Sequence, residues 1–503
     1  MTSEASRIRR VVIVGGGTAG WMAAAALAKV LGTRTLSITL VESEAIGTVG
    51  VGEATIPPIT LFNKLLGLDE DAFVRETKAT FKLGIEFVDW LRPGHRYLHS
   101  FGMFGVDMNG IAFTHYWLRA MREGLALDRD LFNAEAQAAH RGKFGRTPPG
   151  APSTLPRINY AYQFDAALYA AHLRRHAEAL GVRRLEGRIV QVDRDPEREA
   201  IRAVVLDDER VVDGDLFVDC SGFRGLLIEE TLNAGYDDWS RWLPANRAVA
   251  VASERLPDLP PITRATARDA GWQWRIPLQH RTGNGHVFCD AFISEDAATD
   301  TLLAGLDTPA IAEPRVLRFT AGVRRWQWIG NCISLGLASG FLEPLESTSI
   351  HLVQAGISKL LALFPQGAPD PALAERYNRE MTGLYEGVRD FVLAHYVLTE
   401  RADTPFWRHC RSIALPDTLA EKLDRFRTRG EVGVGGMELF RETNWFAIAN
   451  GQGVAPGDYH PVADAMPDAV LRDRLDRIRS GVEQRVAGLG SHDAYLAQLC
   501  ETG

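Results

Sequence analysis

Three glycines near the start of the chain have the spacing that binds the phosphates of a dinucleotide. Gly15, Gly17 and Gly20 form a GxGxxG pattern directly after the apolar residues 11–14 and at the start of an alanine-rich segment. The first glycine permits a tight turn, the second lets a pyrophosphate approach bare backbone, and the third lets a helix pack closely on the strand. Glu42 follows Gly20 by 22 residues (42 − 20), at the end of a predicted strand over 37–41, where a carboxylate binds ribose hydroxyls.

Hydroxyl groups cluster before a second predicted helix. Ser347, Thr348 and Ser349 precede the apolar pattern of residues 350–363, and Glu346 lies directly before them. Serine and threonine are common helix N-caps, so the segment predicts a capped helix. The same hydroxyls and free N–H groups also suit an anion, and both interpretations stay open here.

Lys82 lies within residues 69–91, where apolar side chains recur at the i, i+3 and i+4 spacing of a helix. On this periodicity Lys82 and Glu86 are one helical turn apart and form an exposed ion pair. The spacing alone therefore assigns Lys82 to a solvated helix face.

Bulk properties limit the partners of these groups. The chain has 503 residues, a net charge of −8 and five scattered cysteines without CxxC spacing. The negative charge argues against nucleic acid and anionic membranes, and we expect no membrane span and no metal site. Unpaired cysteines and the lack of a signal peptide predict a reducing compartment, the cytoplasm.

The remaining pattern predicts an α/β chain with Rossmann-like topology and a helical second half. Trp272 and Trp274 lie two apart, hence on one face if extended, and they line a pocket or belong to the core. Residues 371 onward read as mostly helical, ending in an irregular aromatic patch around Trp445. The other expected elements are an aromatic-rich stretch at 95–117, a loop at 142–156, a helix at 164–180 and strands at 188–192, 200–206 and 216–220.

Five segments together resemble the flavin-dependent tryptophan halogenase family. They are GGGTAGWMAA, the lysine in FKLGIEF, HYW at 115–117, GWQWRIP, and SLGLASGFLEPLEST. The resemblance implies that a separate flavin reductase supplies reduced FAD, which with O2 and chloride or bromide yields hypohalous acid. This acid passes through a tunnel to a lysine and halogenates a small aromatic substrate, an indole above all.

The resemblance also implies roles for individual residues. Lys82 is the catalytic lysine and Glu346 its partner carboxylate. The halide binds at Thr348 and Ser349, and Trp272 and Trp274 keep organic substrate away from the flavin. The substrate pocket contains His99, Phe101 and Trp445. FAD binds at Gly15, Gly17, Thr18, Ala19, Gly20, Glu42, Ala45, Gly52, Glu53, Val190, Leu337 and Ile350.

The implied fold is a Rossmann-like FAD-binding domain of the flavin monooxygenase type with a mostly helical substrate-binding region. We expect the FAD-binding domain at 1–370, with an inserted substrate-pocket segment at about 91–155, and a helical cap at 371–503. A homodimer is left open.

Two departures from the family bear on substrate and halide. The tryptophan-specific enzymes carry glycine where Ser349 stands, and their substrate segment near the end of the chain is richer in tyrosine than ETNWFAIANGQG. We therefore predict that bromination is favoured over chlorination and that free tryptophan is a poor substrate. Two alternatives are a flavin-dependent aromatic hydroxylase and a non-catalytic flavin-binding regulator.

Overall fold

The computed structural model describes residues 7–45, 52–125, 127–147, 158–195, 200–367, 370–436 and 438–501. The chain forms two compact units, each assembled from three segments. Unit 1 comprises Met1–Ala79, Phe164–Asn246 and Arg318–Glu386, and unit 2 comprises Thr80–Gln163, Arg247–Leu317 and Gly387–Gly503. These units divide the chain at other residues than the expected FAD-binding domain and cap, because residues 80–163 and 247–317 pack with the end of the chain.

Unit 1 is built on a six-stranded sheet in the order β21-β22-β13-β1-β2-β9. The central strand β1 (Arg10–Val14) pairs in parallel with β2 (Ser37–Glu42) and with β13 (Leu216–Asp219). Parallel pairing continues to β9 (Arg183–Glu186) and β22 (Cys332–Ser334), and β21 (Trp328–Ile329) closes one edge in the antiparallel sense. The predicted Rossmann-like arrangement is confirmed.

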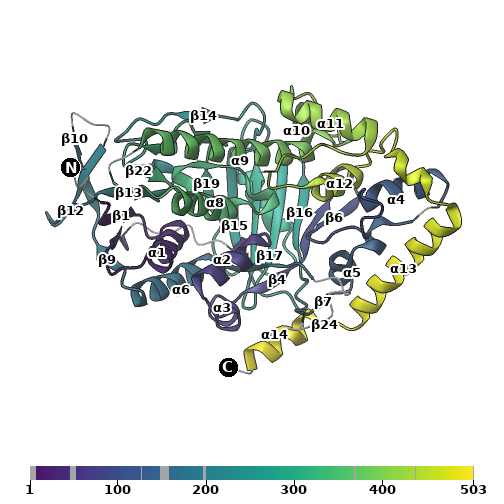
Figure 1. The fold of residues 1–503 in the computed structure, drawn as a ribbon, viewed down its shortest axis with the longest axis horizontal. Helices are drawn as coiled ribbons and strands as arrows, with labels where there is room; N and C mark the ends of the chain where they lie inside the picture. Colours follow the sequence, from purple (N-terminus) through teal and green to yellow (C-terminus); the bar gives the residue numbers. More distant parts are fainter. Residues whose placement is uncertain are drawn as a thin grey trace. The chain divides into compact units, whose positions relative to one another are not determined.

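Small side chains let the helices of unit 1 pack closely. Helix α1 (Thr18–Leu31) buries a run of alanines and contacts α2 (Pro58–Leu66), α6 (Ala166–Ala179) and α8 (Ser349–Ala362) (Figure 1). A short antiparallel sheet contains the expected strands β10 (Ile189–Asp195) and β11 (Ala200–Leu206) with β12 (Val211–Asp213). Another joins β14 (Tyr236–Asp238), β20 (Gly322–Arg324) and β23 (Gly340–Phe341).

Unit 2 is built on a seven-stranded sheet in the order β19-β15-β18-β17-β16-β5-β6, part of which is drawn in teal in Figure 1. Its strands are β5 (Gly84–Val88), β6 (Arg96–Ser100), β15 (Arg247–Ser253), β16 (Thr263–Arg268), β17 (Gly271–Pro277), β18 (Thr282–Phe288) and β19 (Arg315–Arg318). β16 and β5 pair in parallel, whereas β15 with β18, β18 with β17, β17 with β16 and β5 with β6 pair in the antiparallel sense. β6 is an edge strand, and helix α12 (Glu442–Gly451) lies against it.

Helices and the loops that join them make up most of the rest of unit 2. The long helix α9 (Pro371–Val397) enters this unit from unit 1. The others are α4 (Phe113–Arg122), α5 (Ala134–His140), α7 (Glu295–Ala304), α10 (Pro405–Arg411), α11 (Asp417–Arg429), α13 (Asp468–Ala487) and α14 (His492–Glu501). The expectation of a helical chain beyond residue 371 is confirmed, but the supposedly irregular segment around Trp445 is the regular helix α12.

The predicted helix over residues 69–91 is wrong. Helix α3 (Glu70–Glu76) is short, and the chain continues as strand β4 (Thr80–Lys82) and then β5. Lys78 has a φ of +53°, a left-handed conformation that ends the helix. Gly84 explains the strand that follows, because a Cβ there would lie 2.5 Å from the backbone oxygen of His99 on β6. Glu86 pairs with Arg264 and Arg96 at 2.7 and 3.3 Å, and Lys82 is therefore not its helical partner.

Candidate active site

The three glycines after β1 serve three separate steric purposes in unit 1. Gly15 has a φ of +108°, and a Cβ on it would lie 2.3 Å from the carbonyl oxygen of Cys220. A Cβ on Gly20 would lie 1.9 Å from the carbonyl oxygen of Gly15, so the glycine lets α1 pack against the turn. A Cβ on Gly17 would meet no atom of the described residues within 4 Å. Gly17 is thus the glycine that leaves open space at the N-terminus of α1, and its contact with a phosphate group stays a prediction.

Glu42 lies at this same turn. A Cβ on Gly16 would fall 1.4 Å from Glu42 Oε2, which places the carboxylate directly against the glycine backbone. The other carboxylate oxygen accepts a hydrogen bond from Arg184 and lies 3.8 Å from Arg174 Nη1. The carboxylate is therefore fixed with its Oε2 directed to the turn, and its binding of ribose stays a prediction.

A second segment of unit 1 converges on the start of α1. The 3-10 turn η3 (Gly336–Ala338) follows β22, and a Cβ on Gly336 would lie 2.9 Å from the Ala19 side chain. This brings the predicted FAD residues Ala19 and Leu337 into one neighbourhood. The buried Arg324 donates hydrogen bonds to Ala338 and Phe223 carbonyl oxygens, which ties this turn to the segment after β13.

The start of α8 carries the predicted carboxylate and halide residues. Glu346 ends a 3-10 turn, η4 (Pro344–Glu346), and Ser347 follows with a φ of +58°. Thr348 is the N-cap residue, but its hydroxyl makes no capping hydrogen bond. Glu346 and Thr348 are buried and Ser349 is half-buried. The hydroxyl that predicted a capped helix is thus not used for capping, and Ile350 follows in the first turn of α8.

The other predicted FAD residues are spread over unit 1. Thr18 is the first residue of α1, and Ala45 lies in the turn after β2. Gly52 and Glu53 form the short strand β3 (Gly52–Ala54), where desolvation raises the pKa of Glu53 to about 7 although the residue keeps some solvent exposure. Val190 lies on β10, with 55% of its surface exposed. It is in a different sheet from the glycine turn, and its role stays a prediction.

Lys82 lies in unit 2 and is fully buried at the end of β4. β4 pairs with residues 161–163 of β8 (Ala161–Asp165), with Lys82 opposite Ala161. The Lys82 Nζ lies 5.3 Å from the centroid of the Phe101 ring, which is within range of a cation–π contact. The Phe101 N–H donates at 2.9 Å to the carbonyl oxygen of Leu83, the residue after Lys82, which fixes the backbone of Phe101 next to that of Lys82.

An aromatic cluster surrounds His99 in the same unit. Phe391 and Phe440 stack with their centroids 3.6 Å apart, and Trp445 meets Phe391 edge-on at 4.9 Å. The His99 ring lies 5.5 Å from Phe391, and its Nε2 is hydrogen-bonded to the Asn444 side-chain amide at 3.0 Å. His99, Phe101 and Trp445 were expected in a pocket, but Phe391 and Asn444 carry no sequence signal because they lie on helices far along the chain.

Trp272 and Trp274 are both on β17, as the extended spacing predicted, and both are buried. Their ring centroids are 6.1 Å apart. Trp272 meets Trp90, and the Trp274 ring covers Gly285, where a Cβ would lie 2.1 Å from it. Both therefore take part in the core packing of unit 2, and their tunnel role stays a prediction. Lys82 and Glu346 belong to different units, so their pairing also stays a prediction.

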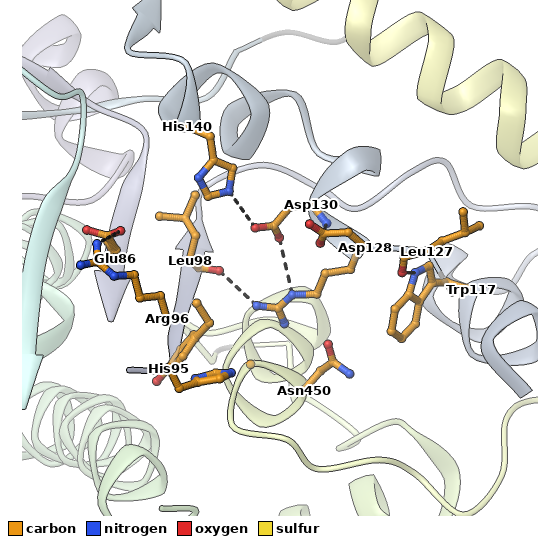
Figure 2. Close-up of a pocket in the computed structure, with 13 residues that line it drawn as sticks. Glu86, His95, Arg96, Leu98, Trp117, Leu127, Asp128, Asp130, His140 and Asn450 are labelled. Atoms are coloured by element: carbon orange, nitrogen blue, oxygen red, sulfur yellow. Dashed lines mark hydrogen bonds and ion pairs between the residues drawn. The ribbon is translucent and has the colours of Figure 1, made fainter. Parts of the chain in front are cut away.

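A separate polar cavity of about 370 Å³ opens beside the edge strand β6. Figure 2 shows Asp130 beside His140, and His140 Nε2 lies 3.0 Å from the Asp130 carboxylate. Arg129 Nε lies 3.5 Å from the same carboxylate. The hydrogen bond to Asp130 raises the pKa of His140, and desolvation lowers the pKa of His95. No predicted site residue lines this cavity.

Comparison with known proteins bears directly on this arrangement. The tryptophan halogenase family model matches residues 10–468. The tryptophan 7-halogenase of Lentzea aerocolonigenes is 36% identical over 519 residues, which cover 96% of each chain. The chain belongs to the flavin-dependent tryptophan halogenase family.

Solved structures of flavin-dependent halogenases have the same fold. One from Xanthomonas campestris is 50% identical with a TM-score of 0.95, covering 98% of this chain and 99% of its own. One from Brevundimonas is 47% identical with a TM-score of 0.94 and the same coverage. As a halogenase, the chain is an enzyme that uses FAD and a halide, and enzymes of this family work with a separate flavin reductase and an aromatic substrate. Among its described residues, no helix is long and apolar enough to cross a membrane, and no cluster of potential metal ligands occurs.

Proposed function

We propose that this halogenase converts halide to hypohalous acid and uses it to halogenate an indole or a similar electron-rich aromatic, with bromide preferred. One observation carries the proposal. The fully buried Lys82 side chain ends 5.3 Å from the Phe101 ring, in the unit that also contains the cluster of His99, Phe391, Phe440 and Trp445. A lysine is almost never fully buried unless its charge is paired.

The residues of unit 1 fit a bound FAD. The open space at Gly17, the free start of α1 and the Glu42 carboxylate form the cradle that the phosphates and ribose of a dinucleotide need. When bound and reduced, FAD supplies with O2 the two-electron oxidation of halide to hypohalous acid. Thr348 and Ser349 would hold the halide with hydroxyl groups and N–H groups at the start of α8.

Lys82 would hold the hypohalous acid by a hydrogen bond from its amine or as a haloamine. The halogen is transferred as X⁺ to a ring carbon, which forms the new carbon–halogen bond. The ring proton leaves, and Glu346 accepts it. The hydroxide left from the hypohalous acid combines with a proton to give water, so atoms and charges balance.

The aromatic side chains of the unit that contains Lys82 favour a planar aromatic substrate. Phe101, Phe391, Phe440 and Trp445 offer ring faces and edges for stacking. Several relatives are named tryptophan halogenases, and one solved structure, 27% identical, is a lanthipeptide tryptophan 5-halogenase. An indole is therefore the first candidate, and we expect free tryptophan to be a poor substrate because residues 442–453 contain no tyrosine that would hold its head group.

The halide preference rests on Ser349. A serine places a Cβ and a hydroxyl donor at the start of α8, where tryptophan-specific enzymes carry glycine. Bromide sheds water more easily than chloride and is the better nucleophile toward a peroxide. A solved relative, 33% identical, is named a chlorinase, so the preference of this chain has to be measured.

The test uses the full chain with FAD, a flavin reductase, O2 and either bromide or chloride. Indole, tryptophan, a tryptophan-containing peptide and a phenol are compared by mass spectrometry. Halogenated indole that requires halide supports the proposal. A hydroxylated product that forms without halide would favour the hydroxylase, and the absence of any product with reduced flavin present would favour the flavin-binding regulator.

A further inference from the structure

The strand that carries Lys82 is held at its edge by a histidine from the far end of the chain. β4 pairs with β8 on one side, and in a strand the N–H groups of alternate residues point to opposite sides. The Phe81 N–H therefore points away from β8. It donates a 3.1 Å hydrogen bond to His492 Nε2. A side chain of α14 thus takes the place that a further strand would occupy.

The hydrogen bonds of His492 require one form of the imidazole. Its Nδ1 lies 2.7 Å from the Leu259 carbonyl oxygen, which only accepts, so Nδ1 carries the proton. The Phe81 N–H only donates, so Nε2 is unprotonated. The fully buried ring is therefore neutral with its proton on Nδ1. Doubly protonated imidazole would direct an N–H against the Phe81 N–H.

The segment that bonds to His492 also holds Leu83, the residue after Lys82. The Leu83 N–H donates at 2.7 Å to the carbonyl oxygen of Pro261, two residues beyond Leu259. Asp493, next to His492, pairs with Arg255 at 2.6 Å and accepts from the Leu259 N–H at 2.8 Å. His492 and the segment 255–261 together therefore hold the peptide groups on both sides of Lys82.

Packing keeps His492 in this position. The backbone N–H of His492 donates to the Gly142 carbonyl oxygen at 2.9 Å. Next to this bond, β24 (Gly490–Ser491) pairs with β7 (Lys143–Phe144). Phe144 stacks on Phe81 with the centroids 4.1 Å apart, and the His492 ring lies 6.0 Å from Phe81. Successive side chains of a strand face opposite ways. Phe81 therefore packs against Phe144 on one face of β4, and Lys82 extends toward Phe101 on the other.

We propose that His492 is a positioning residue for the reaction. It fixes the backbone of β4, so that the Lys82 amine is placed to bind hypohalous acid next to the substrate ring. This inference rests on the proposed function of Lys82. A misplacement of about 1 Å at a reacting group is enough to reduce a rate strongly. Loss of the His492 contact should therefore let oxidant escape before it meets the substrate.

The test is the coupling ratio, the halogenated product formed per reduced flavin oxidised, together with free hypohalous acid trapped by a scavenging dye. His492→Leu removes both hydrogen bonds, and we expect the coupling ratio to fall about tenfold while flavin oxidation continues unchanged. His492→Gln supplies a carbonyl acceptor and an amide donor, and we expect it to restore the ratio to within about twofold of the native protein. His492→Asn is shorter, reaches one of the two partners, and should give an intermediate ratio.

The control is His286→Gln. His286 is also fully buried in unit 2 and also bonds through Nδ1 to a backbone oxygen, that of Ala298, but it lies on β18. A general loss of packing would lower the coupling ratio in this variant as well, which would overturn the inference. A native ratio in His492→Leu, or in His492→Asn should the leucine variant fail to fold, would also overturn it. Native product yield from Lys82→Ala would instead remove the proposed function of Lys82 itself.

Discussion

The Nζ of Lys82 lies 5.3 Å from the centroid of the Phe101 ring, and the Phe101 N–H donates to the carbonyl oxygen of Leu83, the residue after Lys82. A cation held against a ring face in a buried setting is a strong contact. In the reaction proposed above, Lys82 captures the oxidant in this unit, and the oxidant forms at the flavin.

Lys82→Ala should abolish halogenation while reduced flavin is still oxidised. The amine that holds the oxidant is lost, but the glycine turn and the start of α8 belong to the other unit and are unchanged. Product is measured by mass spectrometry and flavin oxidation by absorbance. Lys64→Ala removes an exposed lysine on α2 and serves as the control. Native product yield from Lys82→Ala would exclude the lysine mechanism.

Glu346→Gln should slow turnover by about 10²-fold or more, the usual contribution of a general acid–base group. The amide keeps the size of the buried side chain but cannot accept the ring proton. Steady-state rates with saturating indole and halide report the effect. Glu230→Gln changes an exposed carboxylate that pairs with Arg224 and should leave the rate unchanged. A native rate in Glu346→Gln would remove this residue from the chemistry.

Gly17→Ala and Gly20→Ala form a matched pair for the cofactor site. The added Cβ meets nothing in the protein at Gly17, where φ is −73°, so Gly17→Ala should fold normally but bind FAD more weakly. At Gly20 the Cβ would lie 1.9 Å from the Gly15 oxygen. Gly20→Ala should therefore lose about 1–3 kcal/mol of folding free energy through overpacking. Thermal unfolding and flavin fluorescence titration distinguish the two, and unchanged FAD affinity in Gly17→Ala would contradict the predicted pyrophosphate site.

Bromide should outcompete chloride when both are present at equal concentration. The weaker hydration of bromide and its greater nucleophilicity both favour it, and the Ser349 hydroxyl supplies an additional donor. Ser349→Gly should change the ratio of brominated to chlorinated indole, whereas Ser349→Ala separates the hydroxyl from the Cβ. Efficient chlorination of free tryptophan at one ring position by the native protein would contradict the weight placed on Ser349.

Folding stability should fall below neutral pH through His492. Burial lowers the pKa of its imidazole from 6.5 to about 4, with Asp493 acting to raise it and Arg255 to lower it. Between these two pH values the unfolded chain binds the proton and the folded chain does not. The contribution of neutral His492 to the free energy of unfolding is therefore complete above pH 6.5 and decreases as the pH falls. Near the pKa of the folded state, the free energy of unfolding has fallen on the order of 3 kcal/mol.

Denaturant unfolding at about pH 7 and about pH 4.5 measures this loss. His492→Gln cannot titrate, so its stability should depend less steeply on pH than that of the native protein. Equal pH dependence of the two proteins would show that other groups, such as the buried His286 whose pKa is also about 4, account for the effect.

The nucleotide half of the site could be predicted because its signal is local. The turn, the helix start and Glu42 are set by glycines and apolar residues within one short segment, and the structure brings them together. The tryptophan pair on β17 was predictable for the same reason, since an alternating spacing defines a strand face.

The environment of Lys82 could not be predicted from spacing. Its apolar neighbours fit a helix, but the backbone at Lys78 and the contact of Gly84 with β6 favour strands instead. These are tertiary effects, which override local propensity. Phe391, Asn444 and His492 reach this region from helices hundreds of residues away, so nothing near Lys82 in the sequence points to them.

The hydrogen bond between Phe81 and His492 joins residues 411 positions apart. During translation β4 is made long before its edge partner, so the buried Phe81 N–H gains this hydrogen bond only after residue 492 has left the ribosome. A contact of such high sequence separation forms late in folding, because loop closure over that length has to precede it. A chain that stops before His492 therefore lacks the contact that we propose to position Lys82.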